Sequence, residues 1–183
     1  MASAAHRRGR LGVKKGERKG AQVRRARQTD LRDIARIGNA SFSGLRPLPL
    51  ALRWVRANWA ARPRMRYWIA RRQGPPIAYI LWIEKGGFRP DAVVELEQIA
   101  VAPELRGRGI GQLLVRQSLR ELQREITRSG RRIKIIEVTT GSEQGAIRFY
   151  RRALGATVVA KIPDLFRGTE LVLLARPRIR ARG

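Results

Sequence analysis

Residues 99–111 read Ile-Ala-Val-Ala-Pro-Glu-Leu-Arg-Gly-Arg-Gly-Ile-Gly, and a long amphipathic stretch, 110–128, continues from them without a break. Apolar residues recur in 110–128 at helical spacing with arginines between them, which predicts a helix that packs by one face. The glycines of the turn would let a ligand approach the backbone. The first N–H groups of a helix have no partner inside it, so the stretch predicts a strand, a phosphate-binding loop and a helix.

Two familiar phosphate-binding motifs do not fit this loop. No Gly-Lys-Ser/Thr follows it, so it is not a Walker A loop, and it does not come after the first strand of a dinucleotide-binding fold. The alternative is a structural turn that only joins a strand to a helix, because glycine turns are common there.

Strand and helix patterns alternate along the rest of the chain. Strands are predicted at 23–27, 67–71, 77–84, 92–101, 133–139, 158–162 and 170–175. Helices are predicted from a cap at Thr29 or Asp30 to about 39, and at 47–61, 110–128 and 144–154. Runs of antiparallel strands that lead into a strand–helix–strand crossover predict an α+β fold, a mixed, mostly antiparallel sheet flanked by helices. Strand 133–139 is apolar enough to be expected buried on both faces.

The charge of the chain is extreme, since 40 Lys and Arg against 14 Asp and Glu give +26. Residues 1–21 hold few large apolar side chains and are predicted to form a disordered basic arm. One folded domain is expected at 22–176, with a basic stub at 177–183. Such a field attracts polyanions, so the arm is a candidate for nucleic-acid contact; the alternative is a solvated surface without a partner.

Composition excludes several kinds of site. The chain has no cysteine, and its one histidine, His6, lies in the basic arm. Disulfides and thiolate chemistry are therefore excluded, and a histidine triad or multi-histidine metal centre is not expected. No apolar run approaches the ~20 residues that span a bilayer, and no apolar segment follows the basic start as in a secretory signal. We expect a cytoplasmic protein that holds no metal.

Three blocks of the sequence resemble the GNAT superfamily of acetyltransferases. The family signature Arg/Gln-x-x-Gly-x-Gly/Ala is met by Arg106, Gly109 and Gly111. A second block, 143–156, carries Ala, Phe-Tyr and Gly in the family's order, and 28–35 resembles the family's first strand-to-helix passage. The resemblance spans 22 to about 175. The family often has Asn at the position of Glu143, and Gly-Phe where this chain has Gly-Ala.

The resemblance implies acetyl-CoA as cosubstrate and direct attack of an amine on its thioester. It also implies that the central strand splays from its neighbour, so that backbone groups near Ile99 and Val101 pair with the pantetheine arm. The residues implied to hold the coenzyme are Ile99, Ala100, Val101, Arg106, Gly107, Arg108, Gly109, Ile110, Gly111, Gln112, Glu143 and Tyr150.

Tyr150 matches the family's general acid, and its alternative reading is a core aromatic. Glu97 and Glu95 are the candidates for a base, with Glu97 preferred. At i and i+2 on a strand they share a face, opposite to Leu96 and Gln98, and each would raise the pKa of the other. The alternative is an exposed polar strand face paired with arginines.

The sequence leaves the amine acceptor open among a protein N-terminus, a lysine and a small amine. A basic protein favours acceptors in acidic surroundings, or carried on a nucleic acid or ribosome, over polycations. Trp54 and Trp59 are candidates for the acceptor site, whereas Trp68 and Trp82 are predicted to be core. Edge strands allow a homodimer. The competing function is a GNAT-fold scaffold whose basic surface binds nucleic acid or ribosome without catalysis.

Overall fold

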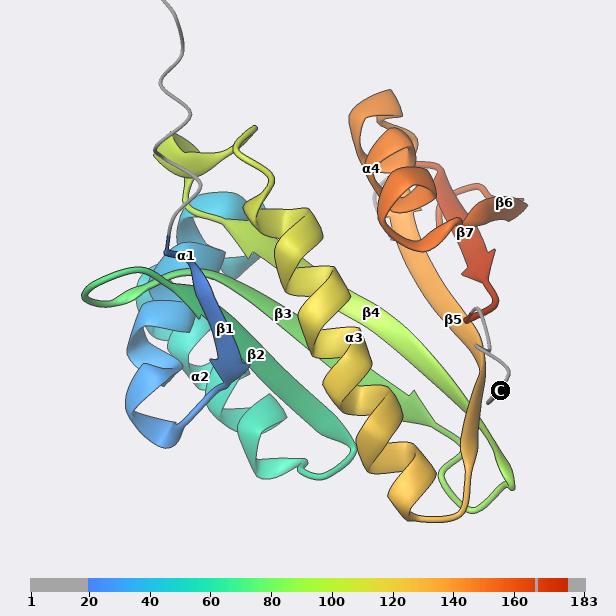
Figure 1. Cartoon of the computed structure of the whole chain (residues 1–183). Coiled ribbons are helices and arrows are strands. Elements are labelled where there is room, and N and C mark those ends of the chain that lie inside the picture. The colour runs from blue at the N-terminus through green and yellow to red at the C-terminus, as the bar shows by residue number, and fades with distance from the viewer. Residues whose placement is uncertain (1–19, 167, 178–183) are drawn as a thin grey trace, which may run out of the picture.

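The computed structural model describes residues 20–166 and 168–177. Its centre is a seven-stranded sheet in the order β1-β2-β3-β4-β5-β7-β6 (Figure 1). Neighbouring strands are antiparallel except for β4 and β5, which are parallel. The strands are β1 Gln22–Arg25, β2 Met65–Arg71, β3 Pro76–Lys85, β4 Asp91–Val101, β5 Arg132–Gly141, β6 Thr157–Ile162 and β7 Glu170–Ala175.

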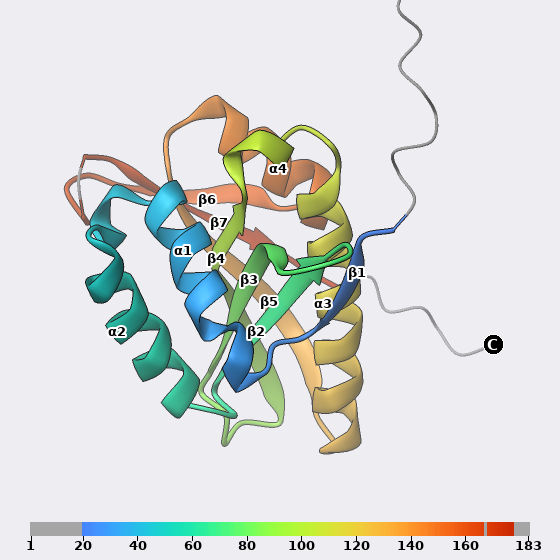
Figure 2. The same ribbon diagram turned by 90° about the vertical axis from the view of Figure 1, so that its left-hand side faces the viewer.

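Helices cover both faces of this sheet (Figure 2). α1, Leu31–Ser41, and α2, Leu48–Ala60, lie on one face, and α3, Ile110–Arg128, and α4, Gln144–Leu154, lie on the other. Short 3-10 turns occur at Gln28–Asp30, Ser43–Leu45 and Pro103–Leu105. The predicted order of strands and helices and the α+β fold class are confirmed.

Each face of the sheet has its own apolar core. Trp68 and Trp82 are fully buried under α3, together with Leu122 of that helix. Tyr67 is fully buried on the other face, under α1 and α2, with Ile34 of α1. Each large apolar side chain buried in this way contributes about 1.5–3 kcal/mol to folding. The prediction that Trp68 and Trp82 are core residues is confirmed.

One local prediction holds in position only, and another is wrong. Asp30 is the N-cap residue of α1, but its side chain makes no capping hydrogen bond to that helix; the carboxylate accepts hydrogen bonds from the N–H of Arg27 at 2.7 Å and from the guanidinium of Arg24 instead. Strand 133–139 is not buried on both faces, since Lys134 is exposed and burial alternates along β5. The reason is that α1 and α2 pack on β2, β3 and β4 and leave the corresponding face of β5 without a helix.

The basic tails lie almost entirely outside the described residues. Only residues 20 and 21 of the predicted arm 1–21, and residue 177 of the stub 177–183, are described. Within the described part, no helix is both long and apolar enough to cross a membrane. Nor do three or more His, Asp or Glu side chains in 20–166 and 168–177 gather as metal ligands.

Candidate active site

β4 and β5 separate halfway along their length. Their parallel pairing joins 91–95 to 132–137 and ends there, although both strands continue (Figure 1). The N–H of Ala102 donates to β3, so by alternation the N–H groups of Ile99 and Val101 point into the gap. The predicted splaying of the central strand is thus confirmed, and its backbone donors face a space that an extended ligand could enter.

A β-bulge at Glu97 lies where β4 leaves β5. Leu96 pairs with Trp82 and Gln98 with the residue before Trp82, so Glu97 has no partner on β3. The extra residue reverses the alternation of side chains. Leu96 packs in the α3 core, whereas Gln98 lies on the other face and accepts a hydrogen bond from the hydroxyl of Tyr79 at 3.1 Å. The prediction that Gln98 shares a face with Leu96 is therefore wrong.

Glycines shape the loop between β4 and α3. Gly107 and Gly109 have φ angles of +74° and +78°, where a side chain costs roughly 1–2 kcal/mol. Nothing lies within 4 Å of a Cβ built on either residue. Gly109 is also the N-cap of α3, and no side chain in the described structure bonds to the cap. The first turn of α3 therefore keeps its N–H donors for a ligand such as a diphosphate.

Gly111 differs from the other two glycines. A Cβ at this position would stand 3.2 Å from the ring of Phe149 and 3.8 Å from Val101. Access for a ligand was the predicted reason for a glycine here, and the structure shows close packing against Phe149 of α4 as the reason instead. The ring of Phe149 meets that of Tyr150 edge-on at 5.2 Å, so Gly111 also helps to set the position of α4.

Arg106 ties the loop to the rest of the molecule. Its Nε donates to the carbonyl of Val101 at 3.1 Å and its Nη2 donates to Oγ of Ser41, at the end of α1, also at 3.1 Å. Arg106 and Arg108 are exposed, so both add positive charge beside the loop. Their predicted contact with the coenzyme stays a prediction.

The remaining predicted coenzyme residues lie around the same place. Ala100 and Ile110 are buried, so only their backbone groups could meet a ligand. Gln112 is half-buried in the first turn of α3. Glu143 is exposed before α4, and its carboxylate folds back over Gly141, 2.7 Å from a Cβ built there. These positions are compatible with coenzyme contact, which stays a prediction.

Tyr150 lies on α4 and is half-buried against the α3 core. Burial raises the pKa of its hydroxyl to about 12. The phenol is therefore neutral across physiological pH and keeps a proton that it can donate. This placement is compatible with both interpretations of Tyr150, a general acid and a core aromatic, and its catalytic role stays a prediction.

Glu95 and Glu97 lie close together, as their predicted shared face requires, and the charge of Glu97 acts on Tyr67 and Tyr79, which are buried under α1 and α2. Burial raises the pKa of Glu97, the charge of Glu95 raises it further, and Lys85 opposes them. Glu95 is held by Nζ of Lys85 at 2.8 Å, and the same Nζ bonds Glu137 of β5 at 2.8 Å. The raised pKa makes the carboxylate of Glu97 a stronger base than that of an exposed glutamate.

Polar side chains beside Glu97 were not predicted. Nδ2 of Asn58 donates to the hydroxyl of Tyr67 at 3.0 Å, and the rings of Tyr67 and Tyr79 meet edge-on at 5.9 Å. Burial raises the pKa of Tyr79, and the charges of Tyr67 and then of Glu97 raise it further. Asn58, a buried amide within the helix 47–61, was the one signal in the sequence that could have pointed to this group.

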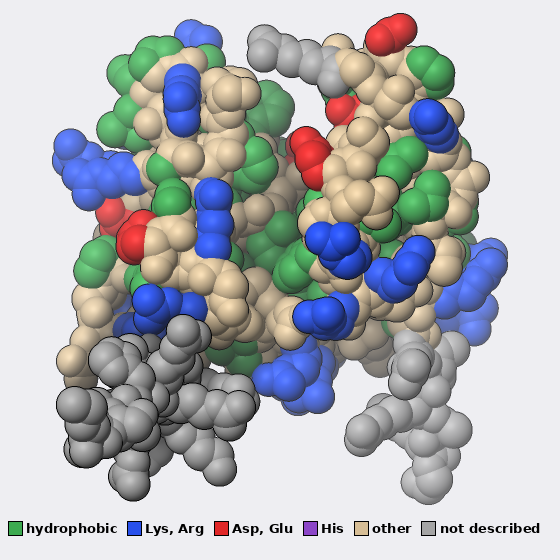
Figure 3. All heavy atoms as spheres, turned by 90° about the horizontal axis from the view of Figure 1, so that it is seen from above, with side chains coloured by type: hydrophobic (Ala, Val, Ile, Leu, Met, Phe, Trp, Pro, Cys, Tyr) green, Lys and Arg blue, Asp and Glu red, His purple; other side chains and the backbone are tan. Residues whose placement is uncertain are grey.

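Seen end-on, the molecule is hollowed between the part with α1 and β4 and the part with α4, β6 and β7 (Figure 3). Apolar side chains line the hollow, and Lys and Arg side chains gather on the side of α3. The gap between β4 and β5 therefore reaches the surface near the glycine loop.

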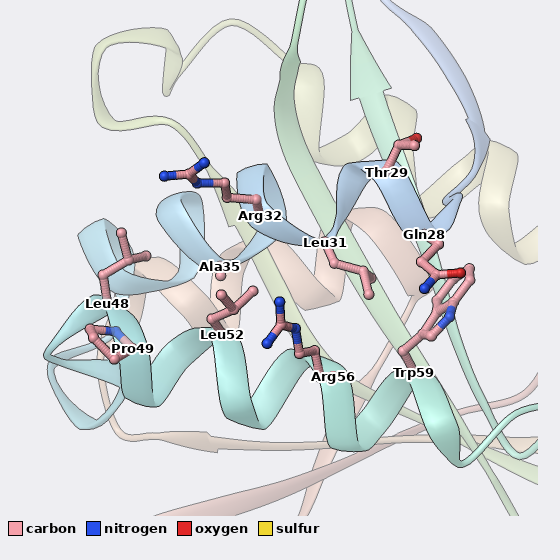
Figure 4. A pocket seen from close by; sticks show the side chains of 10 residues that line it. All are labelled: Gln28, Thr29, Leu31, Arg32, Ala35, Leu48, Pro49, Leu52, Arg56 and Trp59. Carbon is pink, nitrogen blue, oxygen red and sulfur yellow. The ribbon is translucent and has the colours of Figure 1, made fainter.

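A separate cavity of about 670 Å³ lies between α1 and α2 (Figure 4). Leu52 and Trp59 line it together with Arg32 and Arg56, and none of its lining residues comes from β4, β5 or the glycine loop. Trp54 is 42% exposed on α2. The predicted role of Trp54 and Trp59 at an acceptor site stays a prediction.

A family model described as the acetyltransferase (GNAT) family matches residues 31–156. The chain belongs to the GNAT family. The match includes the gap, the glycine loop and α4, which carry the geometry described above. Membership of the GNAT family implies acetyl-CoA as the acetyl donor and an amine as the acceptor.

Relatives of this GNAT chain include an uncharacterized N-acetyltransferase from Methanocaldococcus jannaschii, 32% identical over 91 residues. That match covers 47% of this chain and 37% of the relative, so the chain spans well under two thirds of that protein. Among solved structures, the ribosomal-protein-S18-alanine N-acetyltransferase from Escherichia coli has a TM-score of 0.66 at 15% identity, over 85% of this chain and 93% of that one. Ard1 from Thermoplasma volcanium has a TM-score of 0.65 at 18% identity, over 86% and 97%. These identities show the shared GNAT fold alone.

Proposed function

We propose that this chain transfers the acetyl group of acetyl-CoA to the α-amino group of a peptide or protein. The gap between β4 and β5 carries the proposal, because it joins two faces of the sheet. The glycine loop leads into α3 on one face, and Glu97 lies on the other. A thioester held from the first face can therefore meet an amine that arrives from the second.

The chain's own backbone supplies the grip on the coenzyme in this proposal. The first N–H groups of α3 would hold the diphosphate, with Arg106 and Arg108 adding charge. Ile99 and Val101 would pair with the amide groups of the pantetheine arm, as a neighbouring strand does. The glycine loop suits this task because two of its glycines leave open space in front of the backbone.

The chemistry needs a neutral amine and a proton for the departing sulfur. A bond forms between the amine nitrogen and the acetyl carbon, and the bond from that carbon to sulfur breaks. Glu97 takes the proton that the amine loses, either directly or through a water. Tyr150 gives its proton to the sulfur, which leaves as a thiol. The chain needs no nucleophile of its own for this step.

An α-amine is favoured as acceptor over a lysine or a polyamine. Its pKa of about 8 leaves part of it neutral near pH 7.5, whereas a lysine with a pKa of about 10.4 is almost fully charged, so a weak base suffices for the first. The net charge of +26 also repels polycations. A ribosome-associated acceptor, a homodimer and a cytoplasmic location stay predictions.

Mass spectrometry of three acceptors tests the proposal. One peptide has a free N-terminus and a blocked lysine, a second of the same sequence has the reverse, and spermidine is the third. We expect acetylation of the first peptide, with much slower reaction of the other two. Preference for the lysine peptide or spermidine would contradict the acceptor class.

A thermal shift with acetyl-CoA tests whether the protein binds the coenzyme, independently of whether it acetylates an amine. An intact coenzyme site gains roughly 2.7 kcal/mol of stability at a ligand concentration 100-fold above Kd. If acetyl-CoA stabilises the protein but no amine is acetylated, the result would favour the competing function, a GNAT-fold scaffold without catalysis. Neither stabilisation nor acetylation would contradict the coenzyme site itself.

A further inference from the structure

The outer face of α3 carries a row of arginines. Arg116, Arg120, Arg124 and Arg128 follow one another at intervals of four residues, and all four are exposed. Steps of four residues bring side chains to neighbouring turns of a helix, about 6 Å apart, so the row is about 18 Å long. We refer to these four residues as the α3 arginine row.

The acidic residues of α3 do not neutralise this row. Glu121 turns inward and accepts a hydrogen bond from Nε1 of Trp68 at 2.6 Å. Glu125 pairs with Arg25 of β1 and with Arg66 of β2. Among the described residues, the members of the α3 arginine row form no ion pair with a carboxylate. Both acidic side chains of α3 are therefore engaged with β1 and β2, and neither pairs with the α3 arginine row.

A groove widens this basic face toward α4. Its volume is about 790 Å³, and Arg116 and Arg120 line one side of it. Arg151 and Arg152 at the end of α4 and Arg176 after β7 line the other, and no Asp or Glu is among the lining residues. At its end toward the glycine loop the groove is also lined by Gly109 and Gln112, so there it adjoins the predicted coenzyme site. Figure 3 shows the same gathering of Lys and Arg on the lower side, over α3 and α4, and no Asp or Glu is visible there.

Both ends of the described chain lie beside this face. Pro177, the last described residue, lines the groove, and the sequence continues with Arg178, Arg180 and Arg182. At the other end, β1 packs against α3, and residues 1–19 before it are rich in Arg and Lys. β1 and Pro177, near the two ends of the described chain, thus both lie beside α3, and the sequence beyond each of them is basic.

We propose that the α3 arginine row and the groove beside it bind the phosphate backbone of a nucleic-acid strand. The row extends about three helical turns beyond the loop, which is longer than one diphosphate requires. It contains only arginines, whose planar guanidinium groups bind phosphate with two parallel hydrogen bonds. The inference concerns a second ligand and does not depend on acetyl transfer.

An anionic membrane fits this face less well. Helices that bind at a membrane surface combine basic side chains with large apolar ones that enter the lipid. The exposed large apolar side chains of the described structure all lie elsewhere, on α2, in the β3–β4 turn, on β6 and in the β6–β7 turn: Trp54, Phe88, Val158, Val159, Leu165 and Phe166. The row itself alternates with glutamines and a threonine on its outer side.

Fluorescence anisotropy with the full chain tests the inference. The probes are a labelled 20-nucleotide single strand, as RNA and as DNA of the same sequence, and vesicles that contain phosphatidylserine. The test variant is the triple Arg120→Gln, Arg124→Gln, Arg128→Gln, which leaves out Arg116 next to the coenzyme loop. The matched control is Arg32→Gln, Arg53→Gln, Arg56→Gln, three exposed helical arginines on α1 and α2 with the same change of charge.

We expect the test triple to weaken binding of the strand by about 100-fold at 0.1 M salt and the control by less than about threefold. Each phosphate contact contributes about 0.7 to the slope of log K against log salt for a single strand, so the slope should fall by about 2 in the test triple. Equal binding of RNA and DNA, or a preference for RNA, both agree with the inference. Circular dichroism and the acetyl-CoA thermal shift check that both variants are folded.

Three results would overturn it. If both triple variants weaken binding of the strand equally, the binding would depend on the net charge of the chain and not on the α3 arginine row. Binding to the vesicles without binding to either strand would make the face a membrane surface. Full displacement of the strand from the wild-type chain by saturating acetyl-CoA would assign the phosphate contacts to the coenzyme site.

Discussion

At the scale of single residues, burial acts in the same direction on the two groups proposed to move protons. Tyr150 and Glu97 both have raised pKa values, chiefly because burial disfavours their charged forms. For Tyr150 this keeps a proton available to the sulfur. For Glu97 it makes the carboxylate a stronger base than an exposed glutamate. The two lie on opposite faces of the sheet, joined by the gap.

Tyr150→Phe removes the proposed proton donor without removing the ring. We expect kcat to fall by roughly 10²–10⁴ while the Kd for acetyl-CoA stays nearly constant. Stability should hardly change, because the ring keeps its contacts with Phe149 and the core. Steady-state kinetics and calorimetric titration of acetyl-CoA measure the two quantities. An unchanged kcat would return Tyr150 to the role of a core aromatic.

Glu97→Gln should make the protein more stable and less active. Because the folded pKa of Glu97 is raised, the folded state binds more protons than the unfolded state between the two pKa values. Stability from this group is present at low pH and is lost as pH rises through the folded pKa. At pH 7–8 the variant should therefore unfold at higher urea, with kcat reduced by about 10² or more.

Glu95→Gln is the matched control for that experiment. It removes one of the two carboxylates that pair with Lys85, so we expect lower stability where Glu97→Gln gives higher. Wild-type kcat should rise with pH as Glu97 loses its proton, and Glu97→Gln should lose that part of the profile. A profile that survives in Glu97→Gln would assign the titration to the amine or to another group.

At the scale of elements, the two ends of α3 have the same backbone geometry and different tasks. Gly109 before the helix and Gly130 after it have φ angles of +78° and +75°, and nothing lies within 4 Å of a Cβ on either. The N-terminal glycine faces the proposed diphosphate, whereas the C-terminal one only ends the helix. A substitution at Gly130 therefore measures the cost of backbone strain alone, and the same substitution at Gly109 measures that strain together with any effect on ligand binding.

Gly109→Asp should abolish the acetyl-CoA thermal shift, through the bulk and the charge of the new side chain. Gly130→Asp should cost a similar roughly 1–2 kcal/mol of strain and keep the shift. Differential scanning fluorimetry with and without acetyl-CoA measures both effects. Loss of the shift in both variants, or in neither, would show that the N-terminal turn of α3 is not the coenzyme site.

A buried ion cluster connects strands β2 and β3 with the segment after α3. Glu84 is almost fully buried and pairs with Arg66 at 3.0 Å and with Arg131 at 2.6 Å. Burial acts to raise the pKa of Glu84, but hydrogen bonds with Arg131 and Arg66 hold it below its usual range. Its contribution to stability is therefore present above the unfolded pKa and is lost as pH falls through the folded pKa.

Glu84→Gln should lower the free energy of unfolding by up to about 3–5 kcal/mol at pH 7, because Arg131 loses its carboxylate and the buried Arg66 keeps only Glu125, at 3.5 Å. The difference from wild type should shrink in acid, where the wild-type Glu84 also becomes neutral. Urea unfolding at pH 7 and pH 3 measures it. The exposed pair of Asp33 and Arg36 supplies the control, since Asp33→Asn should have a much smaller effect.

At the scale of the whole molecule, net charge acts on the choice of acceptor. A chain of +26 attracts acidic peptides and repels basic ones, and salt screens both effects. Peptides with the same N-terminus and acidic following residues should have a several-fold lower KM than their basic counterparts in 0.05 M salt. The difference should nearly vanish at 0.5 M. A preference that is insensitive to salt would instead indicate specific contacts in the acceptor site.

The sequence alone determined the order of elements, the extent of α3 and α4, and the position of the glycine loop. These features depend on local patterns: apolar spacing in 110–128, Gly130 beyond its end, and the run of glycines before Ile110. Local backbone chemistry is enough to specify them, since the periodicity of a helix and the need for glycine at positive φ are properties of neighbouring residues.

Only the tertiary structure decided which faces and partners the site has. The bulge at Glu97 depends on the register between β3 and β4, and it moved Gln98 to the face opposite the predicted one. Lys85 and Glu137 meet because strands from distant parts of the sequence lie side by side. Gly111 is a glycine because of Phe149, nearly forty residues later. Such contacts join residues far apart in the chain, so no local pattern can encode them.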